Sequence, residues 1–458
     1  MAFRRFATML ASQAVSQIRN CTSRISFKSL PFATIFGLCG LDSEMEMPRV
    51  LFLITEDWYF WSHRRLLAQH LLQEGYRVDV VTSTGRYYDR IKAAGIHHHS
   101  VGLNRQSKNP LREALTIYQL VRLFSRLRPD IVHAVGMKPM LYGSLAARIA
   151  HVPAIVCAVA GLGWLFSKGG AIKTMARAAV SAYFRGFLHN RDDCRFLVQN
   201  AHHRDLLIRS KIAADSQITQ VAGAGVDIER FCYTPEPDGP PTIVTHARML
   251  RDKGIEDLVQ AARVLKQEHV DCRFLLVGDP DAANPTSIPK EQLRAWTHEG
   301  IIQWQSRRND IPQLLASSHI ACLPSYHEGF PLALVEAAAC GRPIVTTNIP
   351  GCRDVVADGQ SGILVPPRDV PALVTALRRL INDAGLRRSM GRLGRLRVEC
   401  NMSSTTVNNE TVACYERVLN RVEKPHQKQL PTNLAEAART NEDPIGLSHG
   451  KDMLTCEY

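Results

Sequence analysis

The amino-acid sequence predicts an α/β protein with two doubly wound, Rossmann-like domains that face each other across a cleft. Its 458 residues are too many for one ordinary hydrophobic core. From residue 49 onward, short apolar runs alternate with segments of helical periodicity, which is typical of a parallel sheet covered by helices on both faces. This alternation is interrupted by a stretch rich in Gly and Pro and then begins again, which indicates two domains.

Residues 1–47 form a basic extension, which we expect either to be disordered or to result from a misassigned start. The extension has five basic residues and no acidic residue before Asp42. That composition is typical of a mitochondrial transit peptide. We favour a start codon chosen too far upstream, because Met45 or Met47 would begin the chain directly at the first predicted strand.

The first domain is expected to span residues 48–225, and a linker follows at 226–241. Apolar runs predict its strands, and apolar residues at helical spacing predict the helices between them. The strands are predicted at 50–55, 76–84, 130–136 and 194–200, and helices at 62–75 and 110–129.

The second domain is expected to span residues 242–405. Its predicted strands begin with TIVTHARM and CRFLLVGDP, and a helix at 255–268 separates these two. A helix at 406–423 is expected to cross back to the first domain, and the polar tail at 424–458 to be disordered. Because doubly wound sheets bind ligands at the carboxyl ends of their strands, we expect the site in the cleft.

The charge balance narrows the possible partners. Lysine and arginine number 56 against 43 acidic residues, a formal net charge of +13. Such an excess suits nucleic acid, anionic lipid or a phosphorylated substrate. No nucleic-acid-binding signature accompanies it, so we expect no nucleic-acid partner. The chain also lacks a P-loop and a dinucleotide fingerprint, and its 12 cysteines do not have the spacing of a disulfide framework or a zinc site.

Two cations follow the predicted strand TIVTHA. Arg248 and Lys253 lie on a strand-to-helix turn, where their side chains would project into the cleft. They could bind the two phosphates of a nucleoside diphosphate, and fixed cations there would stabilise a leaving diphosphate. A solvated basic turn is the alternative interpretation.

The segment HEGFPLALVEAAACG carries a more specific signal. Pro331 suits the first turn of a helix, which would leave backbone N–H groups free at the positive helix end. Glu328 precedes this helix, and Glu336 lies inside it among apolar residues. A buried carboxylate needs a partner, which the hydroxyl groups of a substrate would provide; a solvent-facing Glu336 is the alternative. The residues expected to contact a substrate here are Glu328, Gly329, Phe330, Pro331, Leu332 and Glu336.

These motifs give the chain a resemblance to a known family. Roughly from Pro48 to Arg421 it resembles a retaining glycosyltransferase of family 4, with the GT-B fold. The matching features of the C-terminal half are Arg248 with Lys253, Gly278-Asp279-Pro280, Glu328 with Glu336, PIVTTNIPG and SGILVPP. The N-terminal half is similar to the branch that elongates bacterial polyprenol-linked glycans, through EDWYFWSHR, KPMLYGSLAAR, AGLGW, VQN and GAGVDIERF. Many relatives have a glycine-rich loop where this chain has TEDWYFWSHR.

The resemblance implies direct transfer of a hexose or N-acetylhexosamine, with retained configuration, from a nucleotide sugar, a UDP-sugar being favoured. The acceptor would be a lipid-linked saccharide of cell-surface polysaccharide biosynthesis, bound by the first domain. Arg248 and Lys253 would hold the donor diphosphate, Glu336 the ribose, and Glu328 would orient the sugar. Gly278 and Asp279 are also expected at the donor. The diphosphate oxygen itself could take the acceptor's proton, so no enzyme carboxylate need be the nucleophile.

The run Asp279-Pro280-Asp281 spells DxD, a metal-binding signature of the other large glycosyltransferase fold. We interpret it as the turn after the strand FLLVG, since the two cations already do the work of a metal. No metal and no cofactor beyond the nucleotide sugar are therefore expected.

Two histidines and one arginine are further candidates. His133 ends the strand DIVHA and is therefore expected to point into the cleft from the acceptor side. The resemblance implies that a histidine at this point contacts donor or acceptor. His63 and Arg64 open the first predicted helix and are expected to contact substrate. A hydrogen-bonded structural role is the alternative for each histidine.

Two other functions remain possible from the sequence alone. A non-hydrolysing sugar-nucleotide epimerase has the same fold, although Arg248, Lys253 and the two glutamates argue against it. A catalytically inactive scaffold of a glycan-assembly complex is the second, and intact residues at every candidate position argue against it.

The expected location is cytoplasmic and peripheral, at the inner face of the plasma membrane. Residues 167–185 place Lys168, Lys173 and Arg177 among apolar residues, which predicts a basic amphipathic helix facing anionic lipid. An ordinary surface helix with its apolar stripe in the core is the alternative.

Overall fold

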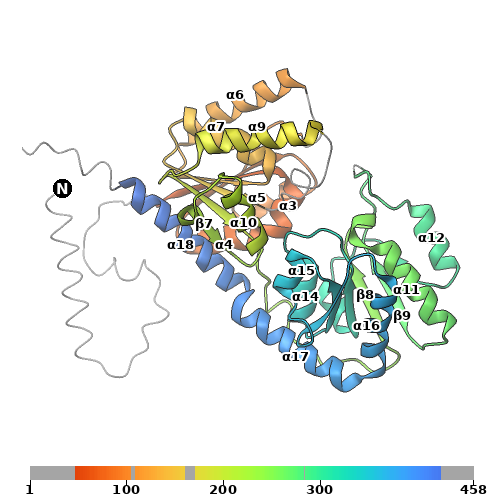
Figure 1. The fold of residues 1–458 in the computed structure, drawn as a ribbon. Helices are drawn as coiled ribbons and strands as arrows, with labels where there is room; N and C mark the ends of the chain where they lie inside the picture. The colour runs from red at the N-terminus through yellow and green to blue at the C-terminus, as the bar shows by residue number, and fades with distance from the viewer. Residues whose placement is uncertain (1–46, 105–108, 160–170, 283, 424–458) are drawn as a thin grey trace, which may run out of the picture.

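The computed structural model describes residues 47–104, 109–159, 171–282 and 284–423. Two lobes are visible, each with a parallel sheet between helices, and a long C-terminal helix runs from one lobe to the other (Figure 1). The predicted α/β class with two doubly wound domains is confirmed. The basic extension and the polar tail lie outside the described residues.

The N-terminal domain has a seven-stranded sheet in the order β3-β2-β1-β4-β5-β6-β7, and every pairing is parallel. The strands are β1 (Arg49–Glu56), β2 (Arg77–Ser83), β3 (His97–Ser100), β4 (Ile131–Val135), β5 (Ala154–Val159), β6 (Cys194–Val198) and β7 (Ile218–Gln220). The helices are α3 (Asp57–His63), α4 (Arg65–Gln73), α5 (Tyr88–Ala93), α6 (Pro110–Leu127), α7 (Met137–Ile149), α9 (Ala171–Phe187) and α10 (Ala201–Arg209).

The C-terminal domain has a six-stranded parallel sheet in the order β10-β9-β8-β11-β12-β13. Its strands are β8 (Thr242–His246), β9 (Arg273–Val277), β10 (Gln303–Gln305), β11 (Ile320–Leu323), β12 (Ile344–Thr347) and β13 (Gly362–Val365). The helices are α11 (Ile255–Gln267), α12 (Lys290–His298), α13 (Ile311–Ala316), α14 (Leu332–Ala339), α15 (Pro350–Val355), α16 (Val370–Asn382) and α17 (Ala384–Asn401), with a short 3₁₀ turn η2 at Arg251–Lys253.

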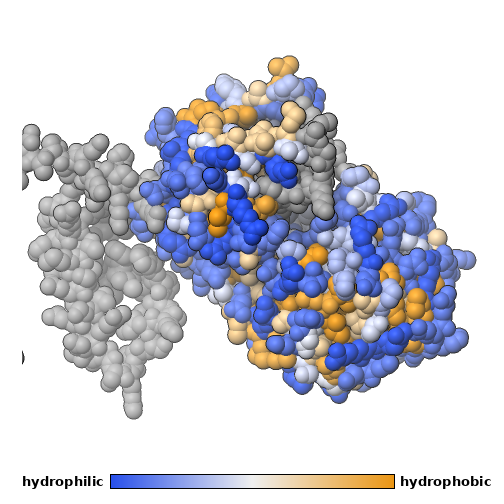
Figure 2. All heavy atoms as spheres, in the orientation of Figure 1, coloured by the Kyte–Doolittle hydropathy of each residue, from blue (hydrophilic) through white to orange (hydrophobic). Residues whose placement is uncertain are grey.

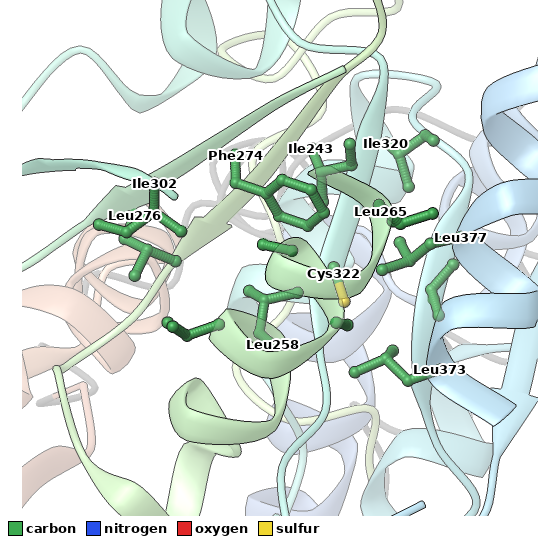
Figure 3. Packing of buried hydrophobic residues seen from close by; sticks show 14 of the residues in the cluster. Ile243, Leu258, Leu265, Phe274, Leu276, Ile302, Ile320, Cys322, Leu373 and Leu377 are labelled. Atoms are coloured by element: carbon green, nitrogen blue, oxygen red, sulfur yellow. The ribbon is translucent and has the colours of Figure 1, made fainter. Parts of the chain in front are cut away.

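The core of the C-terminal domain explains why its strands read as continuous apolar runs. Strand residues such as Ile243 and Ile320 are buried against Leu258 and Leu265 of α11 and Leu377 of α16 (Figure 3). A parallel sheet covered on both faces buries successive side chains, so the period-2 alternation of a half-exposed strand does not arise.

The two domains are joined by paired crossing segments. Helix α18 (Ser404–Glu423) leaves the C-terminal domain and packs on α4, β5 and β6, so that Tyr415 is fully buried in the N-terminal core. Where the chain first crosses, the N–H of Val226 donates to the Met402 carbonyl (2.9 Å). The Val226 carbonyl in turn accepts from Ser404 (2.7 Å). Both crossings therefore lie side by side.

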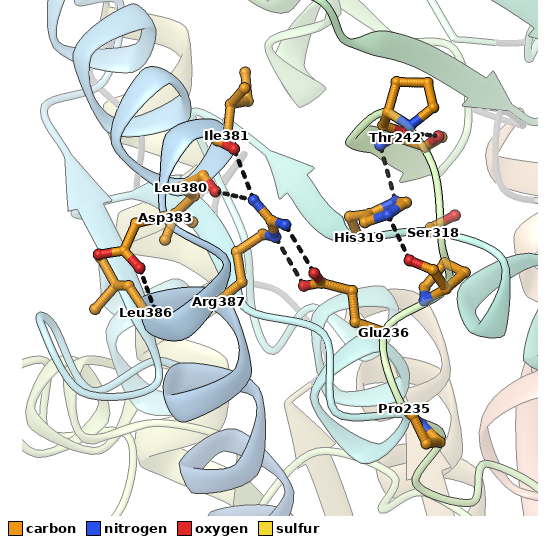
Figure 4. Close-up of polar contacts among 12 residues, drawn as sticks. Pro235, Glu236, Thr242, Ser318, His319, Leu380, Ile381, Asp383, Leu386 and Arg387 are labelled. Atoms are coloured by element: carbon orange, nitrogen blue, oxygen red, sulfur yellow. Dashed lines mark hydrogen bonds and ion pairs between the residues drawn. The ribbon is translucent and has the colours of Figure 1, made fainter.

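The linker is held to the C-terminal domain before β8 begins. Glu236 accepts two hydrogen bonds from the Arg387 guanidinium, each 2.7 Å long, and this ion pair is largely buried (Figure 4). His319 accepts from the Thr242 N–H at 3.0 Å, and its other ring nitrogen donates to the Pro237 carbonyl. These contacts fix the end of the linker as part of the second domain.

One predicted helix differs from the structure. The sequence predicts a single helix over 62–75, whereas α3 and α4 are separate and meet at Arg64, whose backbone leaves the helical region. β1 also passes directly into α3, so residues 57–63 of the segment TEDWYFWSHR form a helix.

Candidate active site

A cleft of about 1930 Å³ lies between the two domains. The carboxyl ends of β1, β8, β9 and β11 open into it, as expected for doubly wound sheets. Eleven of the residues predicted to contact substrate line this cleft: His63, Arg248, Lys253, Gly278, Asp279, Glu328, Gly329, Phe330, Pro331, Leu332 and Glu336.

Lys253 and Glu328 form an ion pair at the floor of the cleft. Lys253 ends the 3₁₀ turn after β8, and Glu328 lies in the loop between β11 and α14. The Lys253 Nζ lies 2.5 Å from Glu328 Oε1, and the Ser325 hydroxyl donates to the same oxygen at 2.8 Å. Their side chains are only 19% and 9% exposed. A mostly buried cation and carboxylate are therefore held together where two parallel strands end.

Arg248 is also paired with a carboxylate, one that the sequence pattern does not indicate. Its guanidinium donates to Asp281 Oδ2 at 2.7 Å, and the two side chains are 40% and 27% exposed. Asp281 belongs to the loop after β9, and its own N–H donates to the Ser287 hydroxyl. The second aspartate of the DxD run thus neutralises the cation predicted to bind phosphate.

Removing this carboxylate should strengthen phosphate binding. We expect Asp281→Asn to raise the affinity for a nucleoside diphosphate by up to about fivefold, because a partly exposed ion pair is worth about 1 kcal/mol or less. Isothermal titration calorimetry with UDP measures this change. Glu256→Gln is the matched control, since it removes a similarly exposed arginine pair, to Arg251, on the same domain. A weaker affinity in Asp281→Asn would mean that Asp281 supports the ligand.

Glu336 has a partner that the sequence did not reveal. It lies on the second turn of α14, and its Oε2 is 2.9 Å from the Nε2 of His246, the last residue of β8. Both side chains are mostly buried, at 19% and 10% exposed. His246 closely precedes Arg248 within HARM, and its position at the end of a strand was the available signal. The imidazole fixes the Glu336 carboxylate at the edge of the cleft.

The start of α14 faces the cleft without a side-chain cap. The helix begins at Leu332, so Pro331 is its N-cap and does not lie in the first turn as expected. A helix N-terminus with free N–H groups favours an anion. Nearby, Gly278 has φ +147°, and a Cβ there would lie 1.9 Å from the Ala247 carbonyl oxygen. Only glycine lets these two strand ends approach so closely.

The wall formed by the N-terminal domain is aromatic and basic. Trp58, Tyr59 and Trp61 of α3 line it, and Trp61 stacks on Tyr87 with the ring centroids 6.0 Å apart. His63 stacks on Tyr59 at 4.2 Å. Burial, followed by the charge of Arg64, lowers the pKa of His63 to about 4. His63 is therefore a neutral imidazole in this wall at neutral pH.

Two predicted site residues do not lie in the cleft wall. His133 sits in the middle of β4, fully buried, and its Nδ1 hydrogen-bonds the Tyr415 hydroxyl of α18. The prediction that it points into the cleft is wrong, because α18 covers the face of the sheet to which it projects. Arg64 is 6% exposed, and one of its guanidinium nitrogens donates to the His63 carbonyl. It lies behind His63 and does not line the cleft.

Solved structures share this architecture. A glycosyltransferase from Rickettsia africae has a TM-score of 0.67 at 19% identity and matches 82% of this chain and 99% of its own. HepE of Anabaena, solved in complex with UDP and glucose, has a TM-score of 0.66 at 18% identity over 80% of this chain and 99% of its own. Two facing Rossmann-like domains of this kind define the GT-B class of glycosyltransferases.

Family comparisons agree for both halves of the chain. Residues 231–397 match the model for glycosyl transferases group 1, and residues 49–188 match the glycosyl transferase 4-like model. The chain therefore belongs to the GT-B glycosyltransferases that combine a 4-like N-terminal domain with a group 1 C-terminal domain, and it is an enzyme of that class. The resemblance found in the sequence is confirmed.

Curated relatives extend over most of the chain. An N,N'-diacetylbacillosaminyl-diphospho-undecaprenol α-1,3-N-acetylgalactosaminyltransferase of Campylobacter jejuni is 24% identical over 75% of this chain and 92% of its own length. A UDP-Gal:α-D-GlcNAc-diphosphoundecaprenol α-1,3-galactosyltransferase of Escherichia coli is 25% identical over 60% of this chain and 72% of its own. The capsular polysaccharide biosynthesis glycosyltransferase CapM of Staphylococcus aureus is 26% identical over 67% and 82%.

Proposed function

We propose that this enzyme transfers a hexose or N-acetylhexosamine from a nucleotide sugar, with a UDP-sugar favoured, to a lipid-linked saccharide, and retains the anomeric configuration. The observation that carries the proposal is the pairing of Lys253 with Glu328 in the interdomain cleft, beside the open N-terminus of α14. Two relatives whose names specify diphospho-undecaprenol-linked acceptors support the choice of acceptor. The setting would be cell-surface polysaccharide biosynthesis.

The proposed donor site uses the cations and the helix end together. The diphosphate takes the place of the carboxylates of Glu328 and Asp281 as the partner of Lys253 and Arg248, and α14 adds its N–H groups. Glu336, held by His246, accepts hydrogen bonds from the ribose hydroxyls. Once released from Lys253, Glu328 is free to hydrogen-bond the sugar and orient it.

The proposed chemical step exchanges one bond for another on the same face of the sugar. The bond between the anomeric carbon and the diphosphate oxygen breaks, and a bond from that carbon to the acceptor oxygen forms. The leaving diphosphate oxygen takes the proton of the acceptor hydroxyl. Arg248 and Lys253 stabilise the charge that develops on the diphosphate.

The function is tested with a panel of nucleotide sugars and a synthetic polyprenyl-diphosphate-linked saccharide. We expect one UDP-sugar to give a product, longer by one sugar, whose new bond has the donor's anomeric configuration, as read by nuclear magnetic resonance. An epimerase would instead change the sugar of the donor without any acceptor. An inactive scaffold would neither transfer the sugar nor slowly hydrolyse the donor. Either result would overturn the proposal.

We also propose that transfer needs no divalent metal ion. The support is that Arg248 and Lys253 supply fixed positive charge at the diphosphate site, and that Asp281 of the DxD run already pairs with Arg248. The transfer rate in excess EDTA should therefore stay within about twofold of the rate without EDTA. A rate that collapses in EDTA and returns with Mg²⁺ or Mn²⁺ would restore the DxD run as a metal site.

We propose that the enzyme works at the cytoplasmic face of the plasma membrane as a peripheral protein. Within the described residues, no helix is long and apolar enough to cross a bilayer. The sequence predicts the contact at the helix 167–185, of which 167–170, with Lys168, lie outside the described residues. In α9, Phe184 is buried, and Val180 and Tyr183 pack against the core. Most of the apolar side chains described on α9 therefore pack into the core of the domain and do not face lipid.

Helix α6 offers a better surface for anionic lipid. Leu111, Leu115 and Tyr118 are 79%, 55% and 57% exposed at helical spacing, and Leu115 also lines the cleft. Arg122 and Arg126 are exposed one and two turns further on. Figure 2 shows apolar surface at the top of the N-terminal domain, where α6 and its neighbours lie in Figure 1. Exposed apolar side chains beside arginines suit the interface of an anionic bilayer.

Charge reversal on α6 should weaken membrane binding. We expect most of the double variant Arg122→Glu and Arg126→Glu to stay in the supernatant when vesicles that contain phosphatidylglycerol are sedimented. Each basic residue near such a surface contributes about 1 kcal/mol to the binding free energy. The same change at Arg388 and Arg392, exposed one turn apart on α17, is the matched control. Equal sedimentation of both double variants would place the contact elsewhere.

A further inference from the structure

Asn200 reaches from the N-terminal domain to the loop that carries Glu328. It follows β6 and is fully buried. Its side-chain oxygen accepts from the His203 N–H at 2.7 Å, which makes it the N-cap of α10. Its side-chain nitrogen donates to the carbonyl of Gly329 in the C-terminal domain, also at 2.7 Å. The oxygen and the nitrogen of the Asn200 side-chain amide are therefore both hydrogen-bonded. The hydrogen bond from the nitrogen joins the two domains.

A second contact holds the same loop against the N-terminal domain. The ring of Phe330 rests on Gly223, which has φ +67° in the chain before the first crossing. A Cβ at Gly223 would lie 2.5 Å from the Cδ1 of Phe330, so only glycine admits the ring. The two residues that follow Glu328 are thus both held against the N-terminal domain.

The C-terminal domain supports the opposite side of this loop. A Cβ at Gly351 would lie 2.6 Å from the carbonyl oxygens of both Glu328 and Gly329. The Gly329 carbonyl, directly after Glu328, is consequently packed between Gly351 of its own domain and the Asn200 amide of the other domain. A small change in the domain arrangement would move the loop, and with it the carboxylate that Lys253 holds.

We propose that Asn200 is a positioning residue, which holds Glu328 in its working geometry when the two domains are closed. The proposal rests on the proposed function and adds to it a residue of the N-terminal domain that acts on the donor sugar through the loop. Asn200 does not itself contact the donor. Its loss should leave the sites for the diphosphate and ribose intact and impair only the orientation of the transferred sugar.

The competing explanation is that Asn200 only caps α10, and two variants separate the roles. Asn200→Asp keeps an oxygen that can accept from the His203 N–H but has no N–H to donate to Gly329. Asn200→Ser also caps a helix, adds no charge, and is too short to reach Gly329. Asp369→Asn and Asp369→Ser are the matched controls, because Asp369 caps α16 by accepting from the Ala372 N–H at 2.9 Å and does not line the cleft.

We expect both Asn200 variants to lower kcat for transfer about tenfold, as for the loss of one buried hydrogen bond that sets a catalytic geometry. The affinity for UDP should stay within about twofold of the wild-type value, while the extra affinity that a UDP-sugar shows over UDP is lost. The Asp369 controls should change neither quantity. Measurements are made well below each variant's Tm, so that a fall in stability does not imitate a fall in kcat.

Two outcomes would overturn the inference. Wild-type kcat in both Asn200 variants would leave Asn200 as a helix cap only. A parallel loss of UDP and UDP-sugar affinity would show that the whole cleft is disturbed and not the sugar alone. Failure of the proposed function looks different, because then the wild-type enzyme itself transfers no sugar and binds a UDP-sugar no better than UDP.

Discussion

Replacing Glu328 with alanine is expected to lower the rate of sugar transfer about a hundredfold and to leave UDP affinity unchanged or slightly higher. The carboxylate is 9% exposed and is held by Lys253 and Ser325 at the point where the transferred sugar would lie. Loss of a charged hydrogen bond made in the transition state costs about 3 kcal/mol, which corresponds to roughly that factor in rate. UDP affinity can rise because Lys253 no longer has an internal partner.

The prediction needs a control for the loss of an ion pair as such. Glu299→Ala removes a carboxylate that pairs with Arg263 on the surface of the same domain, at 46% exposure, and should leave the transfer rate unchanged. Glu336→Ala should also abolish transfer, but through lost affinity for the nucleoside, because Glu336 is assigned to the ribose. Wild-type turnover in Glu328→Ala would contradict the assignment of this loop to the active site.

The alternation of strands and helices was predictable because it depends on local burial. The inner parallel strands are covered on both faces, so they read as continuous apolar runs, as in VLFLIT for β1. Strand order does not follow from such runs, because it depends on how distant strands pair; the structure shows it to be the doubly wound one. The break between α3 and α4 at Arg64 was missed, because no proline or glycine marks it and its backbone angles depend on packing.

Long-range partners explain what the sequence could not predict about the site. Arg248 and Lys253 were placed from their position after β8, but Asp281 and Glu328, their partners, come from other strand ends. His246 is not predicted from the sequence, because its contact with Glu336 spans 90 residues. Each pair forms only because the parallel strands end at one edge of the sheet.

His133 is a second case in which a long-range contact could not be predicted from the sequence. Position along β4 fixes the face to which a side chain projects, but not what covers that face. The cover is α18, whose Tyr415 lies 282 residues further on and hydrogen-bonds the imidazole. Burial therefore lowers the pKa of His133 well below its usual value and keeps the ring neutral. Asn200 was missed for a similar reason, because VQN shows a helix cap but not a partner in the other domain.

Replacing Lys253 with methionine is expected to weaken UDP binding about thirtyfold while uridine binding stays within about twofold. A charge-assisted contact to phosphate is worth about 2 kcal/mol, and uridine has no phosphate to lose it. Calorimetry with both ligands measures the difference. Lys266→Met is the matched control, because that lysine donates to the carbonyls of Glu299 and Gly300 on the surface. Equal losses for UDP and uridine would show that Lys253 does not contact the phosphates.

The same variant should also destabilise the protein, and a second substitution should reverse this. Lys253→Met leaves the Glu328 carboxylate mostly buried, with the Ser325 hydroxyl still bonded to it. An uncompensated charge of this kind costs several kcal/mol, whereas removal of both charges is close to neutral. The double variant Lys253→Met with Glu328→Gln should therefore regain most of the lost Tm while UDP binding stays weak. Because stability returns and affinity does not, the lysine's contribution to binding is separated from its contribution to the fold.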